Sequence, residues 1–256
     1  MKKKDIWIAD LTHTAQGISA NTFPLGAGYV ASYAKQELGN NFDVKLFRFP
    51  LQLSDELQKK TPAMLCFSNF SWNFELAYKF AELAKKYDPN VITVFGGPNF
   101  PTEKQEKLEF LQKRIAIDFY IELEGELAFV DLAKNLIENN FNSKKLKQTN
   151  KAIKNLCYIH EHNLISGPIE RIKDINVIPS PYLTGMLDEY FNFPLIPMVE
   201  TTRGCPFACA FCCDGHSTRN KVCRYDPKRT EEELYYIAKK VKNIDELIIT
   251  DLNFAM

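Results

Sequence analysis

The sequence predicts an α/β protein in which a doubly wound parallel sheet of five strands precedes the start of a (β/α) partial barrel. Through the first 140 residues, short apolar runs alternate with segments of helical periodicity. Such alternation is typical of parallel strands joined by right-handed crossovers. After residue 194, a strand, a loop, a helix and a strand follow one another. We therefore expect a first domain over 1–140, a connector with a small hairpin over 141–194, and an incomplete second domain over 195–256.

Five apolar runs are the expected strands of the first domain. They are residues 6–9, 44–47, 63–67, 91–95 and 117–121. The expected helices are 27–38, 74–87 and a segment that carries apolar residues at helical spacing from 127 to 136. We interpret nearly all of these apolar positions as core.

The connector and the second domain contain fewer regular signals. Residues 139–154 lack periodicity, which predicts a solvated loop. Two short runs, 156–160 and 164–165, predict a hairpin, and the proline-rich segment 167–197 predicts an extended strap. An apolar run up to Val199 is the next expected strand. A capping box from Thr230 to Glu233 predicts a helix that ends near Val241, before a strand over 246–250.

Composition and charge exclude several classes of protein. The 256 residues are 45% apolar and 25% charged, with a net charge of zero, which gives no support to a nucleic-acid or anionic-membrane surface. There is no apolar run long enough for a transmembrane helix, and the amino-terminal sequence lacks the apolar core of a signal peptide. The odd count of seven cysteines, with three of them in one loop, argues against a disulfide framework and favours a reducing, cytoplasmic setting.

Polar and glycine-rich segments follow four of the expected strands. Because ligands of open parallel sheets bind beyond the carboxyl ends of the strands, these segments form the candidate binding edge. They are residues 10–17, 68–73, 96–99 and 122–126. The ordinary preference of loops for Gly, Asn and Pro explains about half of this pattern.

One glycine motif is discounted as a nucleotide site. Gly26-Ala-Gly28-Tyr-Val-Ala31 matches the dinucleotide fingerprint, but some sixteen residues separate it from the strand it should follow. We expect these glycines to pack the first helix against the sheet.

Three cysteines follow the strand that ends at Val199. Cys205, Cys209 and Cys212 have three and then two residues between them. Three thiolates from one loop suit a metal or a cluster with an open coordination position. A zinc site would need a fourth ligand, for which Cys213, His216 or Cys223 is a candidate, and a redox couple would need only Cys209 and Cys212. An iron–sulfur cluster uses all three, and the pattern favours it.

The cysteine motif and the upstream domain each resemble a known protein family. The CxxxCxxC spacing, with Phe211 before the last cysteine and Thr-Arg-Gly before the first, resembles the radical S-adenosylmethionine (SAM) enzymes. The upstream domain resembles the flavodoxin-like cobalamin-binding domain of one branch of that superfamily. The matching pieces are Pro24-Leu-Gly26, Ser71-Trp-Asn73, Phe95-Gly-Gly-Pro98, Glu124-Gly-Glu126, Arg203-Gly-Cys-Pro-Phe207 and Asp251-Leu-Asn-Phe254.

The resemblance implies three cofactors and the residues that bind them. Cys205, Cys209 and Cys212 would hold a 4Fe–4S cluster. Phe211 would lie against the adenine of SAM, with Asp251 and Asn253 near its methionine part. The implied cobalamin contacts are Ser68, Ser71, Asn73, Gly96, Gly97, Glu124, Gly125 and Glu126. Thr12 occupies the position of the cobalt-binding histidine of some cobalamin proteins, and we interpret His13 as an ordinary loop residue.

The implied activity is radical chemistry. One electron from the cluster would cleave SAM into methionine and a 5′-deoxyadenosyl radical, and the leading use of the corrinoid is methyl transfer to an unactivated carbon. The implied partners are a small-molecule substrate and an electron donor such as a flavodoxin or ferredoxin. Two alternatives stay open: a zinc- or iron–sulfur-binding sensor without catalysis, and a radical SAM enzyme whose upstream domain no longer binds cobalamin. We expect 195–256 alone to be too short a barrel for turnover.

Overall fold

The chain divides into two compact units, which are described separately. The computed structural model describes residues 3–14, 17, 20–39, 42–212 and 220–254. The first unit comprises Met1–Ala20 and Tyr33–Glu170, and the second comprises Asn21–Ser32 and Arg171–Met256. Helix α1 (Leu25–Leu38) therefore contributes residues to both. In the described part of the chain, no helix combines the length and the apolar character needed to cross a membrane.

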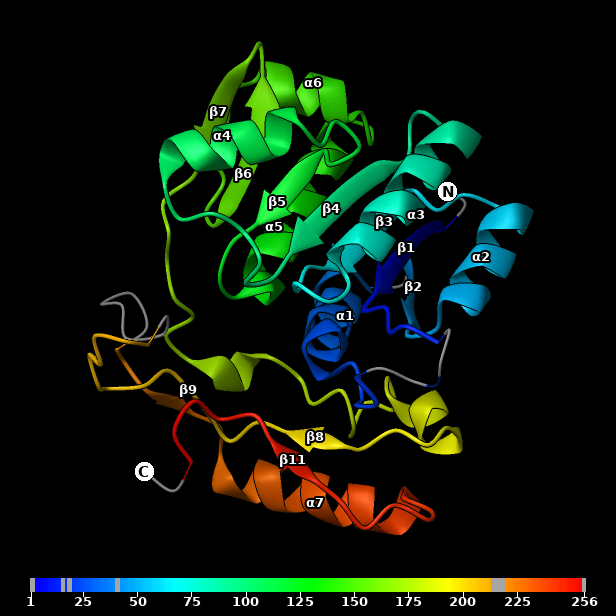
Figure 1. Cartoon of the computed structure of the whole chain (residues 1–256), viewed down its shortest axis with the longest axis vertical. Helices are drawn as coiled ribbons and strands as arrows, with labels where there is room; N and C mark the ends of the chain where they lie inside the picture. Colours follow the sequence, from blue (N-terminus) through cyan, green and yellow to red (C-terminus); the bar gives the residue numbers. More distant parts are fainter. Residues whose placement is uncertain (1–2, 15–16, 18–19, 40–41, 213–219, 255–256) are drawn as a thin grey trace. The chain divides into compact units, whose positions relative to one another are not determined.

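A single mixed sheet forms the centre of the first unit (Figure 1). Its order is β2-β1-β3-β4-β5-β6-β7, and the first five strands run parallel. These five confirm the predicted doubly wound sheet, in the flavodoxin-like order. The bounds are β1 Lys4–Ala9, β2 Phe42–Phe47, β3 Met64–Ser68, β4 Ile92–Gly96, β5 Phe119–Ile121, β6 Leu156–His160 and β7 Asn163–Ser166.

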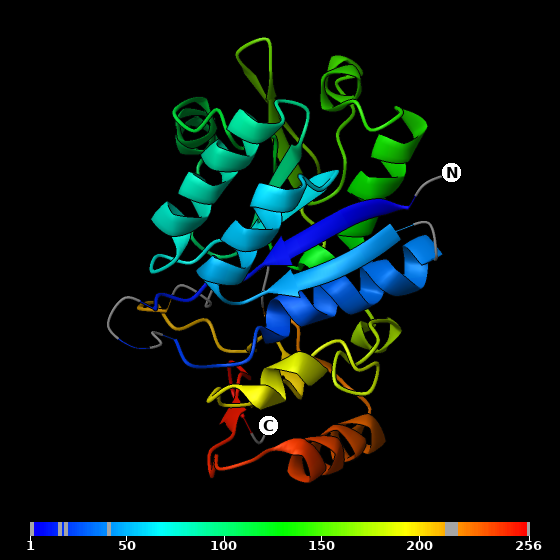
Figure 2. The same cartoon turned by 90° about the vertical axis from the view of Figure 1, so that its right-hand side faces the viewer.

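Helices cover both faces of this sheet (Figure 2). One face packs on α2 (Pro50–Lys59), α3 (Phe74–Tyr87) and α4 (Lys104–Gln112), and the other on α5 (Gly125–Glu138) and the end of α1. Because side chains alternate along a strand, Trp7 and Ala9 of β1 join the cluster beneath α2 and α3 while Ile6 and Ile8 are buried on the opposite side. A strand buried on both faces is apolar throughout, which is why the sequence runs are continuous.

Three features of the first unit differ from the sequence predictions. Helices α2 and α4 were not predicted, and residues 139–154 are not simply a solvated loop. They contain helix α6 (Ser143–Gln148), whose amino end is capped by Asn142 as it accepts from the Lys145 amide at 3.0 Å. The predicted hairpin is present as β6 and β7, and it joins the sheet through antiparallel pairing of Cys157 with Tyr120. The hairpin thereby covers an edge that β5 would otherwise expose.

The second unit contains the predicted strand–helix–strand element. Strands β8 (Met198–Val199) and β11 (Ile248–Ile249) pair in parallel, with helix α7 (Pro227–Lys240) between them in sequence. A second ladder pairs β9 (Thr202–Arg203) with β10 (Cys223–Arg224) in antiparallel fashion. The connector is not a plain strap, because it forms the 3₁₀ turns η2 (Ile175–Val177) and η3 (Asp188–Asn192).

The predicted start of α7 was wrong by one turn. Asp226 is the N-cap and accepts from the Lys228 amide at 2.8 Å, with Pro227 as the first helical residue. Proline is favoured there because its missing N–H would have no partner in the helix. Thr230, the predicted cap, lies inside the first turn, where its hydroxyl contacts the Asp226 carbonyl at 3.4 Å.

The glycines of α1 also have a different role from the one predicted. A Cβ on Gly28 would lie 3.1 Å from side-chain atoms of both Pro181 and Leu187, whereas one on Gly26 would meet nothing within 4 Å. Gly28 therefore makes room for the turn near Leu187 in the second unit, and no packing of Gly26 against the sheet is observed.

Candidate functional site

Asp10 is the centre of a polar network at the carboxyl edge of the first sheet. Its Oδ2 lies 2.6 Å from Nη1 of Arg48, and the two side chains are only 13% and 2% exposed. Its Oδ1 accepts a hydrogen bond from the Ser68 hydroxyl. The Asn73 amide nitrogen lies 3.0 Å from that hydroxyl oxygen and 3.4 Å from Oδ1. Two predicted corrinoid residues, Ser68 and Asn73, thus meet around an aspartate that the sequence pattern did not assign.

The end of β4 packs tightly against the loop that follows β3. Gly97 has a φ of +130°, and a Cβ there would lie 2.6 Å from the Asn69 carbonyl oxygen. The Asn69 side-chain amide donates to the Asn99 carbonyl at 2.7 Å and contacts the Tyr120 hydroxyl at 2.9 Å. Burial raises the pKa of Tyr120, so its hydroxyl stays protonated and donates to the Gly97 carbonyl at 2.9 Å. Gly97 is therefore required by packing within the loops themselves.

Two aromatic rings lie at the tip of the loop after β3. Phe70 and Trp72 stack with centroids 4.5 Å apart and an interplanar angle of 10°. Trp72 is 50% exposed, and Ser71 between them is also exposed. The His13 Nε2 atom lies 2.5 Å from the Trp72 carbonyl oxygen, which supports the interpretation of His13 as a loop residue. The edge therefore offers a flat apolar surface within the predicted binding segment 68–73, in which Trp72 was not singled out as a contact.

The remaining predicted corrinoid residues begin helix α5. Glu124 is the residue before the helix, Gly125 is its first residue, and Glu126 in the first turn is buried. They follow β5, whose parallel neighbour β4 ends at Gly96. The predicted corrinoid residues therefore lie in the last residues of strands, the following loops and the first turn of α5 at one edge of the sheet, and the structure joins Ser68 directly to Asn73.

The cysteines of the second unit lie in a loop with a fixed base. Arg203 pairs with Cys223 and Thr202 with Arg224, while the Tyr225 amide donates to the Thr201 carbonyl at 3.0 Å. Cys205 is half-buried, and Cys209 and Cys212 are exposed. The three thiols are free of disulfides and are a donor set that suits a thiolate-bound cluster.

The thiols do not form a closed metal site in this structure. Within the described ranges, no three Cys, His, Asp or Glu side chains gather as a metal-binding group. Two of the candidates for a fourth zinc ligand, Cys213 and His216, lie outside the described residues. The third, Cys223, is buried with its thiol directed at the Ile172 carbonyl 3.5 Å away.

The predicted SAM residues have contrasting surroundings. Phe211 is 94% exposed and Asn253 is half-buried. Asp251 already has partners: its Oδ1 accepts from the amides of Thr201 at 2.7 Å and Thr202 at 3.0 Å. Its Oδ2 accepts from the Thr201 hydroxyl. Phe211 is open to a ligand, whereas the Asp251 carboxylate is largely engaged by the protein.

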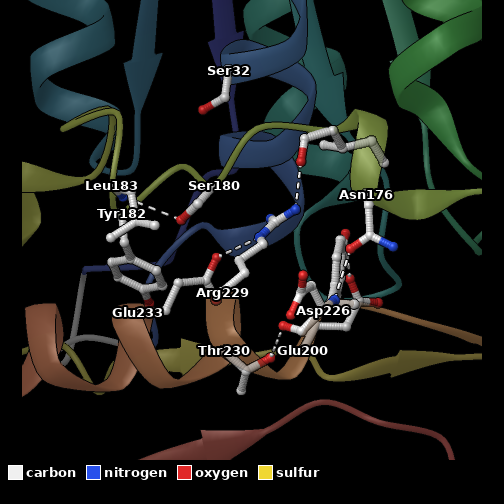
Figure 3. Close-up of polar contacts among 12 residues, drawn as sticks. Ser32, Asn176, Ser180, Tyr182, Leu183, Glu200, Asp226, Arg229, Thr230 and Glu233 are labelled. Atoms are coloured by element: carbon white, nitrogen blue, oxygen red, sulfur yellow. Dashed lines mark hydrogen bonds and ion pairs between the residues drawn. The ribbon is translucent and has the colours of Figure 1, made fainter.

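Two arginines, Arg203 and Arg229, lie near the ring of Tyr225, and Figure 3 shows the contacts of Arg229. Nε of Arg229 donates to Glu233 at 3.1 Å and its Nη1 donates to the Ile178 carbonyl at 2.5 Å. Its guanidinium lies 4.1 Å from the Tyr225 ring centroid. Arg203, whose guanidinium lies 5.9 Å from the same ring, donates to Glu200 at 2.9 Å. The sequence pattern gave no sign of this cluster beyond the four-residue spacing of Arg229 and Glu233.

Two other cysteines, Cys66 and Cys157, are buried and differ in this respect from the cysteines of the loop. Burial raises the pKa of Cys66, and burial together with the neighbouring Glu122 carboxylate raises the pKa of Cys157 to about 12. The Cys157 thiol donates to Glu122 over 2.8 Å. Both stay protonated at neutral pH, and neither is a ready nucleophile or ligand.

Comparison with known proteins identifies similar chains for both units. The B12 binding domain family matches residues 16–133. The chain is 30% identical over 255 residues to the 2-(S-pantetheinyl)-carbapenam-3-carboxylate methyltransferase of Streptantibioticus cattleyicolor, covering 94% of this chain and 35% of that protein. It is 28% identical over 247 residues to the cobalamin-dependent radical SAM methyltransferase TokK of Streptomyces tokunonensis, covering 91% of this chain and 34% of TokK. The chain thus spans about a third of the length of these curated relatives.

The fold is also shared with solved structures. One is the cobalamin-dependent SAM radical enzyme OxsB with aqua-cobalamin and SAM bound. The match covers 98% of this chain and 34% of the OxsB chain, with a TM-score of 0.72 and 18% sequence identity. Another is the radical SAM methyltransferase TsrM from Kitasatospora setae with tryptophan and a SAM analogue bound. That match covers 98% of this chain and 48% of the TsrM chain, with a TM-score of 0.69 and 13% sequence identity. Both confirm the α/β architecture.

The Asp10 network predicts a measurable cost of losing its carboxylate. We expect Asp10→Ala to lower the free energy of unfolding by about 3 kcal/mol or more, because it removes the partner of a buried guanidinium. Urea unfolding followed by circular dichroism measures the change. The control is Glu82→Ala, which removes an exposed partner of Lys79 and should cost less than about 1 kcal/mol. Equal losses in the two variants would contradict the central role of Asp10.

The contact at Gly97 predicts a steric effect. Gly97→Ala should destabilise the protein by about 2 kcal/mol or more, since the new Cβ would overlap the Asn69 carbonyl at an unfavourable φ. Gly26→Ala, at an exposed helical position with open space, should instead raise stability by roughly 0.5–1 kcal/mol. Differential scanning calorimetry compares the two, and a neutral Gly97→Ala would show that the loop relaxes freely.

Proposed function

The chain belongs to the cobalamin-binding branch of the radical SAM superfamily, and from this membership we propose that it carries the corrinoid and cluster sites of a methyltransferase. The proposed substrate is a small molecule with an unactivated carbon, and the proposed electron donor is a flavodoxin or ferredoxin. The proposed setting is the cytoplasm. The observation that carries the proposal is the presence, in one chain, of a B12-binding match at 16–133 and of three free thiols on the loop that follows β9.

The cysteine loop is proposed to hold a 4Fe–4S cluster through Cys205, Cys209 and Cys212. When bound, the cluster supplies the electron that divides SAM into methionine and a 5′-deoxyadenosyl radical. The exposure of Cys209 and Cys212 supports this assignment because both thiols can reach an incoming ion. Phe211 next to them has its ring open to solvent, which supports a stacking role against adenine.

The carboxyl edge of the first sheet is proposed to bind cobalamin. When bound, the corrinoid supplies a carrier for the methyl group. Gly96 and Gly97 are proposed to contribute through their backbone, because the space that a side chain would occupy is filled by Ile121 and Asn69. Ser71 offers an exposed hydroxyl. Ser68 and Asn73 are proposed to act through their shared network, and Glu124, Gly125 and Glu126 through the start of α5. The stacked pair Phe70 and Trp72 adds an aromatic surface for a macrocycle.

Anaerobic reconstitution with iron and sulfide tests the cluster. We expect the 256-residue chain to take up about four iron and four sulfide atoms, and Cys209→Ala to lose nearly all of them. Cys157→Ser is the matched control, since the hydroxyl can still donate to Glu122 and the residue lies outside the loop. Uptake of one zinc ion and no iron–sulfur cluster would instead favour the zinc-binding sensor.

Equilibrium binding of hydroxocobalamin, followed by its visible absorption, tests the corrinoid site. Trp72→Ala should weaken binding about fivefold, the loss expected for about 1 kcal/mol of aromatic contact. Ile115→Ala removes another exposed apolar side chain, 87% exposed, and should leave the affinity unchanged. If the unmodified chain binds no hydroxocobalamin but does form a cluster, the upstream domain has lost its cofactor.

A further inference from the structure

Asp251 contacts the segment that leads into the cysteine loop. It follows β11, and β11 pairs with β8 so that Ile249 lies beside Val199. The Thr250 amide extends this pairing by donating to the Val199 carbonyl at 2.9 Å. The Asp251 carboxylate then accepts from two successive amides, those of Thr201 and Thr202, and from the Thr201 hydroxyl.

These contacts leave the carboxylate little capacity for a ligand. An ionised carboxylate has about four acceptor positions, and three donors already occupy Asp251. Hydrogen bonds from backbone amides to a charged acceptor are among the stronger ones in proteins. The arrangement therefore fixes backbone rather than presenting a free anion.

The same short segment is held from other directions. Thr202 and Arg203 form the ladder with Cys223 and Arg224, and the Arg203 side chain donates to Glu200 at 2.9 Å. Gly204 then takes a φ of +97°, which turns the chain into Cys205. Hydrogen bonds or strand pairing thus restrain each of the residues 200–203, which lie just before Gly204 and the first cysteine.

We propose that Asp251 is a positioning residue for the cysteine loop, in place of the position near the methionine part of SAM that the family resemblance implied. The proposal rests on the assignment of the cluster to this loop. A loop with an ordered base loses less conformational entropy when its thiolates bind a cluster, so Asp251 strengthens cluster retention without touching the cluster.

Two readouts on the full chain test this role. The first is amide hydrogen exchange at residues 201–212 of the cluster-free chain, which needs no cluster to form. The second is the lifetime of the reconstituted cluster against an iron chelator, with no SAM present. We expect Asp251→Ala to raise the exchange rates about tenfold and to shorten the lifetime by a similar factor.

Conservative variants separate positioning from a general loss of structure. Asp251→Asn should stay within about threefold of the unmodified chain, because the amide oxygen still accepts from both N–H groups. Thr201→Ala should show a smaller effect than Asp251→Ala, and Thr201→Ser should show none. Asp245→Ala, an exposed aspartate before β11, is the control and should change neither readout.

The opposite pattern would overturn the proposal. If Asp251→Ala exchanges and retains its cluster like the unmodified chain but loses affinity for SAM, Asp251 is a ligand contact. If the unmodified chain forms no cluster, the proposed function fails. Hydrogen exchange still decides the positioning role in that case: faster exchange in Asp251→Ala supports it, and unchanged exchange rejects it.

Discussion

Parallel strand pairing determines which loops can meet in both units, because aligned strands end at the same level of the sheet. In the first unit, Ala9 lies beside Phe47 on one side and beside Phe67 on the other. The residues that directly follow Ala9, Phe47 and Phe67 are Asp10, Arg48 and Ser68. These three form the network described above. In the second unit, Ile249 lies beside Val199, so Asp251 and Thr201 follow at matching positions. The same register rule thus produces both polar clusters.

An aspartate after a strand serves the same physical purpose in each case. Asp10 and Asp251 each accept hydrogen bonds from a neighbouring loop, and each leaves much of its carboxylate unavailable. Acidic residues at such an edge would ordinarily be the first candidates for ligand contacts. Here they act as internal acceptors, and exposed neutral groups such as Ser71 and Trp72 are left at the surface.

Four of the parallel strands, β1, β3, β4 and β5, could be predicted because they are mostly buried and therefore largely apolar. The edge strand β2 is partly exposed and includes Lys45, and only its second half was predicted, from the run 44–47. Helices α2 and α4 escaped prediction since they bury few side chains: Leu53 and Leu57 in one, and Leu111 in the other. The start of α7 was misplaced because two capping signals compete, and Asp226 followed by proline provides the one that forms. Local sequence does not decide between such signals when both are chemically sound.

The candidate site divides in the same way. Cysteine spacing is local, so Cys205, Cys209 and Cys212 could be chosen from sequence, whereas Arg48 and Asp10 are 38 positions apart and meet only through strand register.

Exposure of the loop thiols also determines how readily oxidants reach them. Dissolved oxygen and peroxide reach Cys209 and Cys212 directly, while Cys66 and Cys157 are shielded. Oxidative damage would therefore begin at the very residues proposed to carry the cluster, and strict anaerobic handling protects them.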